Sequence, residues 1–349
     1  MLVNYIQRKQ IDEQEVKNLL QSSFSLNHFT NNGPVKNLLE KLLHTKLGLS
    51  QEKSVVCLSN GTAACHALML MYEQMHGKKL KWVVPSFTFP TPVVGRFSNV
   101  KVVDIDPETY TVSLGSEEVL KADGVIITNL FGTCNQIQEW TDFCKINNKI
   151  LIFDNASSPM SSYKSKNICE FGDSSFGSLH HTKYLGFGEG GFVVVEKDLY
   201  DTVNSIANFG FKTTQRIHSS FSSNFKMSDI AAAYCYQQIK NYNLVDHLRV
   251  QNSAIERIKS IGIEIFNTND SQSKYVLGNL PILFDKPIDT LRFRDLGVEA
   301  NKYYRPIKNL RESKKIYSRM VNLPLNESLS DYQIDIMFKA VREVRDANR

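Results

Sequence analysis

Lys183 is the residue of this sequence whose setting most clearly suggests covalent chemistry. It follows the polar stretch 178–182 and precedes the glycine-rich segment GFGEGG at 186–191. A lysine that is desolvated in a cleft can form a Schiff base with a carbonyl compound, and glycines let a backbone approach a flat ligand closely. The segment is not a dinucleotide-binding fingerprint, because the strand-like run GFVVV follows it where that fingerprint has a helix.

Two further groups of residues lie where an apolar run ends. The turn SNGT at 59–62 joins such a run to an alanine-rich helical pattern. Gly61 either leaves backbone N–H groups free to bind a phosphate, or Asn60 or Thr62 simply caps the helix. Asp154 follows the run KILIF, at a strand end where open α/β sheets bind ligands. Its carboxylate either pairs with a cationic ring nitrogen or begins a turn.

The histidines and cysteines show no metal-binding pattern. His180 and His181 are adjacent, so on a strand they would point to opposite faces. The six cysteines form no C-x-x-C pair and no cluster with zinc spacing. We therefore expect no metal site, and we expect small buried thiols at Cys57, Cys65, Cys134, Cys144, Cys169 and Cys235.

These residues need a scaffold of alternating strands and helices. Apolar runs that predict strands lie at 54–58, 81–84, 100–105, 124–128, 149–153 and 191–195. Helical patterns lie between them, starting at Thr62, after Asn135 and at Leu199, and two more come first, at 12–22 and from Pro34. This alternation predicts βαβ units and a mostly parallel sheet that is covered on both faces.

The pattern changes from about residue 228 onward. Two long helical stretches are followed by a strand-like run at 277–284, a helix near 288–296 and a C-terminal helix from Ser330. We therefore predict a large domain at 1–235 and a smaller α+β domain at 236–349.

Composition limits the class of protein. The chain has 349 residues, of which 42% are hydrophobic and 22% charged, so it is neither disordered nor a coiled coil. Its net charge of +5 is small and scattered, which does not indicate a nucleic-acid partner. No apolar segment reaches about 18 residues, and the first residues have no signal-peptide core. We expect a cytoplasmic protein without a membrane partner.

Taken together and in this order, the motifs resemble those of the DegT/DnrJ/EryC1/StrS family of sugar-nucleotide aminotransferases, over nearly the whole chain. SNGTAACHALML is similar to S-G-T-A-A-L-H-x-A-L, and SLHHTKYLGFGEGG to S-F-H-x-x-K-x-x-x-x-G-E-G-G. Other similar segments are VVPSFTFPTP, VKVVDIDPETYTV, SSNFKMSDIAAAY and NLPLNESLSD. The resemblance implies an α/β fold of type I among the pyridoxal-phosphate enzymes, with a mostly parallel central sheet flanked by helices and a smaller C-terminal α+β domain.

The resemblance also implies roles for individual residues. Lys183 is the lysine that would bind pyridoxal phosphate covalently and move a proton during the reaction. Asp154 would keep the pyridine nitrogen protonated, so that the ring is an electron sink. Phe89 would stack on the ring, and Asn224 would reach the phosphate of a neighbouring subunit's cofactor, which implies a homodimer. The remaining phosphate contacts would come from Gly61, Thr62 and Ser178.

Three positions depart from the family pattern. Ser157 stands where relatives have a glutamine that contacts the ring hydroxyl, and its hydroxyl group is expected to contact the cofactor instead. Lys226 replaces an arginine and Lys308 a histidine at positions that lie near the substrate's diphosphate in relatives. Lysine keeps the charge in each place but loses the bidentate geometry of arginine. Both lysines are also consistent with a solvated surface position.

The predicted activity is amino transfer from L-glutamate, which leaves as 2-oxoglutarate, to a nucleotide-linked keto-deoxysugar. The best specific substrate is dTDP-4-keto-6-deoxyglucose, aminated at carbon 4. A 3-keto sugar aminotransferase and a non-catalytic regulator on the same fold remain as alternatives. A sugar dehydratase of the same fold would carry histidine in place of Lys183, and a nicotinamide-dependent oxidoreductase would need the missing fingerprint.

Overall fold

A seven-stranded sheet forms the centre of the computed structural model, which describes residues 2–134, 136–212, 215–216, 220–266, 268 and 270–348. Its strands are β1 (Lys53–Leu58), β2 (Trp82–Pro85), β3 (Lys101–Val103), β4 (Gly124–Thr128), β5 (Ile150–Asp154), β8 (Ser174–Ser178) and β9 (Gly191–Glu196). They lie in the order β1-β9-β8-β5-β4-β2-β3. Neighbours from β8 to β3 pair in parallel, whereas β9 is antiparallel to both β1 and β8. The prediction of a mostly parallel sheet is therefore confirmed.

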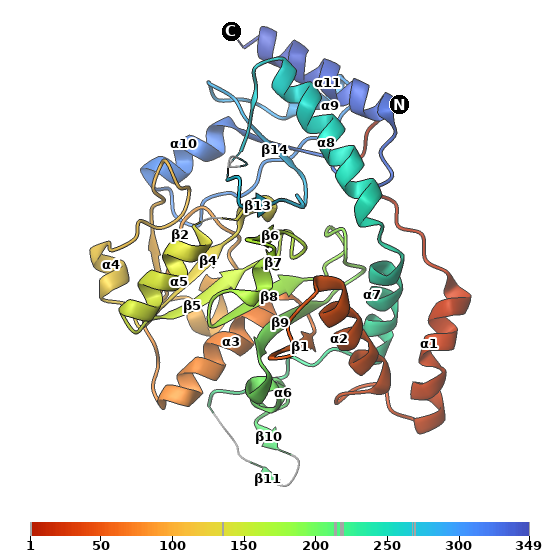
Figure 1. Ribbon diagram of the computed structural model, residues 1–349, viewed down its shortest axis with the longest axis vertical. Coiled ribbons are helices and arrows are strands. Elements are labelled where there is room, and N and C mark those ends of the chain that lie inside the picture. The colour runs from red at the N-terminus through yellow and green to blue at the C-terminus, as the bar shows by residue number, and fades with distance from the viewer. Residues whose placement is uncertain are drawn as a thin grey trace.

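Helices cover both faces of this sheet, as the continuous apolar strands predict (Figure 1). In β4, Val125 and Ile127 belong to one buried cluster and Ile126 to another, because successive side chains of a strand point to opposite faces. The first cluster includes residues of α1 (Glu13–Leu26), α2 (Pro34–Leu47), α5 (Ile137–Ile146) and α7 (Asp229–Asn241). The second includes residues of α3 (Gly61–His76) and α6 (Tyr200–Ala207). Asn135, which precedes α5, lies outside the described residues.

The C-terminal part has its own sheet and its own buried cluster. The antiparallel strands β12 (Glu264–Ile265), β14 (Leu280–Leu283) and β15 (Met320–Leu323) pack with α8 (Leu244–Ser260), α9 (Leu291–Asp295) and α11 (Asp331–Asp346). This arrangement confirms a smaller α+β part. The boundary between residues 235 and 236 stays a prediction. The other α-helices and strands are α4 (Glu117–Leu120), α10 (Arg311–Arg319), and the short strands β6 (Ser162–Tyr163), β7 (Lys166–Asn167), β10 (Phe211–Lys212), β11 (Gln215–Arg216) and β13 (Ser273–Lys274).

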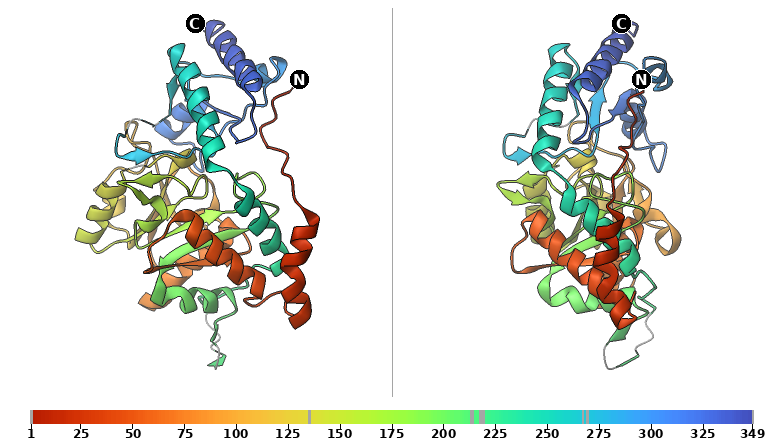
Figure 2. Two further views of the ribbon diagram at one scale, coloured as in Figure 1. Left: turned by 45° about the vertical axis from the view of Figure 1, so that its right-hand side comes forward. Right: turned by 90° about the vertical axis from the view of Figure 1, so that its right-hand side faces the viewer.

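The first residues of the chain connect these two parts. Val3 is fully buried in the C-terminal cluster, and its backbone exchanges hydrogen bonds with Gly297 and Glu299. The chain then runs in an extended course to α1, whose preceding residue Asp12 is hydrogen-bonded to the side chain of Gln237 in α7. The N-terminus consequently lies near α11, far from α1 (Figures 1 and 2). We call residues 3–12 the N-terminal strap.

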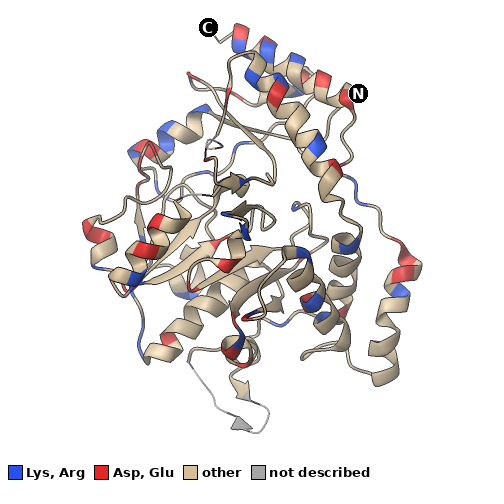
Figure 3. Cartoon of the chain, in the orientation of Figure 1, with Lys and Arg blue, Asp and Glu red and all other residues tan. Residues whose placement is uncertain are grey.

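The two signs of charge are intermixed along the helices and loops, with no single face of one sign in the view of Figure 3. Among the residues that the structure describes, no helix combines the length and the apolar composition that crossing a bilayer requires. All six cysteines are buried with free thiols, as predicted. Burial raises the pKa of Cys134, Cys144 and Cys169 to about 12.

Candidate active site

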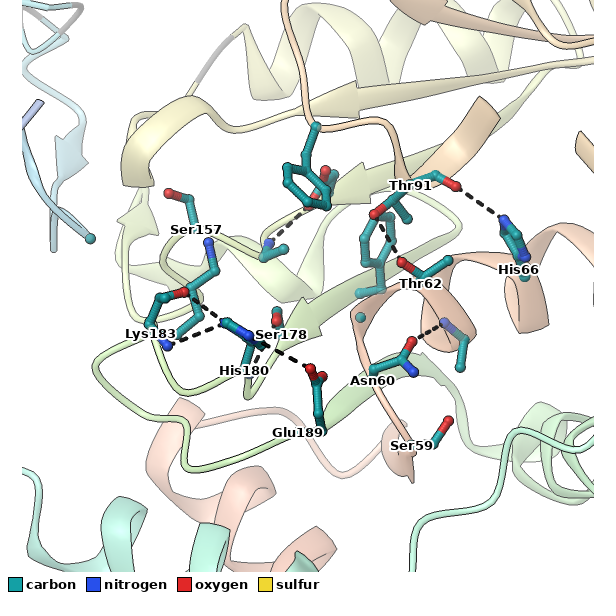
Figure 4. Close-up of a pocket in the computed structure, with 18 of the residues that line it drawn as sticks. Ser59, Asn60, Thr62, His66, Thr91, Ser157, Ser178, His180, Lys183 and Glu189 are labelled. Atoms are coloured by element: carbon teal, nitrogen blue, oxygen red, sulfur yellow. Dashed lines mark hydrogen bonds and ion pairs between the residues drawn. The ribbon is translucent and has the colours of Figure 1, made fainter. Parts of the chain in front are cut away.

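A cavity of about 730 Å³ lies at the carboxyl ends of the parallel strands (Figure 4). Asp154 and Ser178 end β5 and β8, and the turn that follows β1 leads into α3 at the same edge. A sheet of this type binds ligands at this edge because the loops that follow parallel strands meet there. The predicted site residues that line the cavity are Gly61, Thr62, Phe89, Asp154, Ser157, Ser178, Lys183 and Asn224.

Asp154 is a buried carboxylate at the floor of the cavity, and it is only 3% exposed. Its Oδ1 accepts a 2.9 Å hydrogen bond from the backbone N–H of Ala156, and Thr128 lies 3.5 Å from Oδ2. Burial raises the pKa of Asp154 to about 6, although these bonds and the charge of Lys183 act in the opposite direction. An acid in this setting is stabilised as a carboxylate by a cationic partner. The burial of Asp154 fits a ring-nitrogen partner, whereas its bond from Ala156 is the bond that an aspartate at a turn makes, so the role of Asp154 stays a prediction.

Lys183 lies in the loop between β8 and β9, and this loop has defined backbone geometry. The N–H of Lys183 donates to the carbonyl of His180 at 2.8 Å, and the N–H of Gly186 donates to the carbonyl of Lys183 at 3.0 Å. Burial lowers the pKa of the Lys183 amine, and the charge of Asp154 partly opposes this effect. A lowered pKa increases the fraction of neutral amine, which is the nucleophilic form that attacks a carbonyl.

The start of α3 provides an anion site. Asn60 caps the helix, because its side chain accepts a 2.8 Å hydrogen bond from the N–H of Ala63. The N–H groups of Gly61 and Thr62 are left without acceptors inside the helix, and the helix dipole favours an anion beside them. The hydroxyl-bearing Ser178 lies opposite, since a Cβ on Gly61 would come within 3.3 Å of its Oγ. Capping and phosphate binding are thus compatible at one turn.

The two phenylalanines of the segment VPSFTFP have opposite environments. Phe87 is fully buried, whereas Phe89 is 54% exposed and lines the cavity. The ring of Phe89 lies edge-on to that of Tyr304, with 6.4 Å between centroids. Phe89 is therefore not a core residue, and its ring is available to stack on a flat ligand.

Ser157 lines the cavity beside a tyrosine that the sequence reasoning did not assign. The hydroxyl of Tyr304 donates to Ser157 Oγ across 3.4 Å, and its buried ring stacks on Phe131 at 5.3 Å. Burial raises the pKa of Tyr304, so its hydroxyl stays protonated. Tyr303 also lines the cavity, and the two tyrosines lie a few residues before Lys308 in the sequence.

Two predicted residues lie apart from the cavity lining. Lys226 Nζ lies over the ring of Phe209, 4.4 Å from its centroid, and Lys308 is exposed, with its backbone hydrogen-bonded to Ser86. The residues that line the cavity include neither lysine. Their binding of a diphosphate stays a prediction. Asn224 lines the cavity of its own chain, so its contact with a neighbouring subunit also stays a prediction.

Other lining residues were missed because long-range packing brings them to the cavity. Tyr5 comes from the N-terminal strap and Asn279 from the segment before β14. Neither residue lies in a motif, and neither has a neighbouring residue in sequence that carries chemistry. Only the fold shows that they belong to the site.

The model of the DegT/DnrJ/EryC1/StrS aminotransferase family matches residues 9–342. The chain belongs to this family. A GDP-perosamine synthase from Escherichia coli O157:H7 is 24% identical over 82% of this chain and 84% of its own. A dTDP-4-amino-4,6-dideoxy-D-glucose transaminase from Shigella dysenteriae is 24% identical over 91% and 92%. The structure of a sugar aminotransferase, Spr1654 from Streptococcus pneumoniae in its PLP form, superimposes with a TM-score of 0.81 at 18% identity, over 99% of each chain.

The predicted enzyme class and cofactor are therefore confirmed: the chain is an aminotransferase that uses pyridoxal phosphate. The residues present fit this cofactor on structural grounds. Asp154 is a buried acid that a cation would stabilise, the start of α3 presents N–H groups to an anion, and Phe89 exposes an aromatic ring in the same cavity. The amine of Lys183 reaches the same cavity.

Proposed function

We propose that this aminotransferase moves an amino group from L-glutamate to a nucleotide-linked keto-deoxysugar, with Lys183 as its catalytic residue. The observation that carries the proposal is the meeting of four chemical features in one cavity. These are an amine with lowered pKa, a buried acid, an anion site and an exposed aromatic ring, provided by Lys183, Asp154, the start of α3 and Phe89.

Each residue has a role that follows from its environment. Pyridoxal phosphate, when bound, supplies an electron sink and carries the amino group between donor and acceptor. Lys183 would hold it covalently, and the Lys183 amine, when free, would move a proton as a general base and acid. Asp154 holds the proton on the ring nitrogen. Gly61, Thr62 and Ser178 hold the phosphate, and Ser157 contacts the ring.

The proposed substrate is dTDP-4-keto-6-deoxyglucose, aminated at carbon 4. It is supported by the Shigella relative, which is named as a transaminase of a dTDP-linked 4-amino sugar. The Escherichia relative is named as a synthase of a GDP-linked sugar, so GDP-linked sugars are the competing substrate class. A cavity of about 730 Å³ is large enough for a cofactor together with part of a nucleotide sugar.

We further propose that the enzyme is a homodimer. Asn224 and Lys226 belong to the exposed or half-buried segment 222–226, and Lys226 Nζ lies 4.4 Å from the ring centroid of Phe209, whose large apolar side chain is 46% exposed. A two-fold interface over this segment would cover that ring. It would also bring Asn224 toward a second active site, as the family resemblance implies.

The central assignment is tested by trapping the lysine. Borohydride reduction of the loaded protein should place a stable pyridoxyl adduct on Lys183, identified by peptide mapping. Lys183→Ala should lose the adduct and the transfer of nitrogen from glutamate. An adduct on another lysine would contradict the proposal, and a protein that binds the cofactor but transfers nothing would support the regulator alternative.

The substrate is tested by a panel of keto sugars. Purified protein is incubated with glutamate and with dTDP- or GDP-linked 4-keto and 3-keto sugars, and the product is identified by mass spectrometry and NMR. The proposal expects an amine at carbon 4 of the dTDP sugar. Amination at carbon 3, or of the GDP sugar alone, would replace the proposed substrate while leaving the enzyme class intact.

A further inference from the structure

Lys9 on the N-terminal strap reaches the loop that carries the catalytic lysine. Its Nζ donates hydrogen bonds to the backbone carbonyls of Lys183 and Gly186, which are 174 and 177 residues away in the sequence. Lys9 and Lys183 also line one small cavity together, adjacent to the main one. A single ammonium group thus joins the two ends of the turn that presents Lys183.

The surroundings of Lys9 show that this contact is built into the fold. The side chain is half-buried, and its burial lowers the pKa of Lys9 to about 8. The ionisable groups that interact with it include Glu327, from the loop after β15, Cys235, on α7, and His181, whose pKa is lowered by burial and by the charge of Lys9. An ammonium with two carbonyl acceptors makes charge-assisted bonds, which are stronger than neutral ones. The strap itself is fixed at both ends by its bonds to Glu299 and Gln237.

The turn at Lys183 is held by other contacts as well, such as the 2.9 Å hydrogen bond that the side chain of Gln238 on α7 donates to the carbonyl of Tyr184. Within it, the N–H of Gly186 donates to the carbonyl of Lys183, and that same carbonyl is the one that Lys9 binds. Gly186 cannot carry a side chain, because a Cβ would come within 2.3 Å of the backbone of Leu179 and His180. The backbone of the turn therefore packs closely against residues 179–180 at Gly186, and Lys9 binds the carbonyls at both of its ends.

We propose that Lys9 is a positioning residue, which holds the Lys183 turn so that the catalytic amine keeps its reactive geometry when it is released from the cofactor. This proposal rests on the proposed role of Lys183. When substrate has replaced the lysine, no covalent bond fixes the amine, and the position of its backbone decides where the proton can be taken and returned. A displacement of about 1 Å in such a group lowers a rate roughly 100-fold.

The test compares Lys9→Met, which keeps the length but removes charge and donors, with Lys9→Arg, which keeps both. Lys17→Met is the matched control, because Lys17 is exposed on α1 next to the strap. In each loaded protein, single-turnover absorbance gives the limiting rate of the glutamate half-reaction and the half-saturating glutamate concentration. Borohydride trapping gives the amount of adduct on Lys183, so that rates are expressed per active site.

For Lys9→Met we expect a limiting rate lower by roughly 10- to 100-fold, with half-saturation and trapped adduct near the parent values. Lys9→Arg should recover at least about a third of the parent rate, because it keeps a charge-assisted donor, and Lys17→Met should match the parent. Two results would overturn the proposal. One is a limiting rate for Lys9→Met within twofold of the parent rate, even if its melting temperature is lowered. The other is an equal loss of limiting rate in Lys9→Met and Lys9→Arg. Absence of an adduct on Lys183 in the parent would instead reject the proposed function.

Discussion

At the scale of single residues, Asp154 links the chemistry of the site to the stability of the empty protein. A buried carboxylate is costly, because water no longer solvates its charge. Burial raises the pKa of Asp154 to about 6, against an ordinary value of 3.8. A group whose pKa is raised by folding stabilises the protein below its unfolded pKa, and this contribution is lost as the pH rises through the folded pKa. The window for Asp154 is therefore about pH 4 to 6.

Asp154→Asn should accordingly stabilise the cofactor-free protein at high pH. A shift of about two pKa units corresponds to roughly 3 kcal/mol, so the free energy of unfolding at pH 8 should rise by up to about that amount. At pH 4 the gain should nearly vanish, because the native aspartic acid is then neutral. Urea unfolding at the two pH values measures the difference. An equal gain at both values, or a loss at pH 8, would contradict the assigned environment.

The same variant should lose most of its amino transfer. An amide at position 154 cannot keep the ring nitrogen protonated, so the electron sink is weakened. Lys183 should still be trapped by borohydride, which separates a chemical defect from a failure to bind the cofactor. Turnover within a few-fold of the parent would mean that Asp154 is only a turn residue.

At the scale of elements, the sheet depends on a close approach between β9 and the turn before α3. A Cβ on Gly191, the first residue of β9, would lie 2.4 Å from the backbone carbon and oxygen of Asn60 and 2.6 Å from the nitrogen of Gly61. Contacts this short cannot persist, so any larger residue must displace the turn that presents the phosphate site. Gly188 lies in the loop that precedes β9. A Cβ on Gly188 would meet open space, but its φ of 64° is in the left-handed region.

Gly191→Ala should therefore weaken cofactor binding at least about tenfold and reduce stability by roughly 1–3 kcal/mol. The matched Gly188→Ala should reduce stability by about 1–2 kcal/mol, the cost of a left-handed residue with a side chain, and leave cofactor affinity near the parent value. Fluorescence titration with the cofactor and urea unfolding give the two quantities. Equal cofactor affinities for the two variants would show that β9 does not position the phosphate turn.

Elements with strong apolar patterns could be predicted from the sequence, and elements without them could not. The run GVIIT at 124–128 matches β4, and Pro34 begins α2 as predicted, with Gly33 before it. The helix α10 was missed, because the charged segment Arg311–Arg319 buries only Ser313 and Ile316 and has no continuous apolar stripe. The reversed direction of β9 could not be predicted either, since an apolar run reads the same in parallel and antiparallel pairing.

The residues of the candidate site also fall into those that could be predicted from the sequence and those that could not. The meeting of Asp154, the turn at Gly61 and Lys183 in one cavity was predictable, because the first two lie at strand ends, Lys183 lies in the loop after β8, and each has recognisable neighbours in sequence. Tyr5 and Asn279 reach the cavity through tertiary packing of the strap and the C-terminal part, which leaves no local pattern.

At the scale of the whole molecule, the two substrates of the cycle are expected to meet different parts of the protein. In the proposed reaction the residues that line the cavity would serve both halves, whereas Lys226 and Lys308 lie outside the cavity lining. A diphosphate that extends out of the cavity would need cations outside the cavity lining, where these two lysines lie. Lys226 is half-buried, which lowers its pKa, and Lys308 is exposed.

Alanine at either lysine should raise the KM for the sugar nucleotide by roughly 10- to 100-fold if the lysine binds the diphosphate, since bonds to charged groups contribute about 1.5–3 kcal/mol when desolvated. The glutamate half-reaction and the cofactor spectrum should stay unchanged. Separate measurement of the two half-reactions checks this. Unaltered KM values in both variants would identify solvated surface lysines, and loss of the cofactor would contradict the assigned positions.

The buried cysteines have a consequence for how this molecule can be observed. Because burial holds their pKa values high and water away, the native protein should react slowly with Ellman's reagent and release all six thiols only on unfolding. A new cysteine at an exposed position of the strap, such as Gln10→Cys, would then be labelled selectively without removing any native cysteine. A fluorophore attached there would report whether the strap moves while the enzyme turns over.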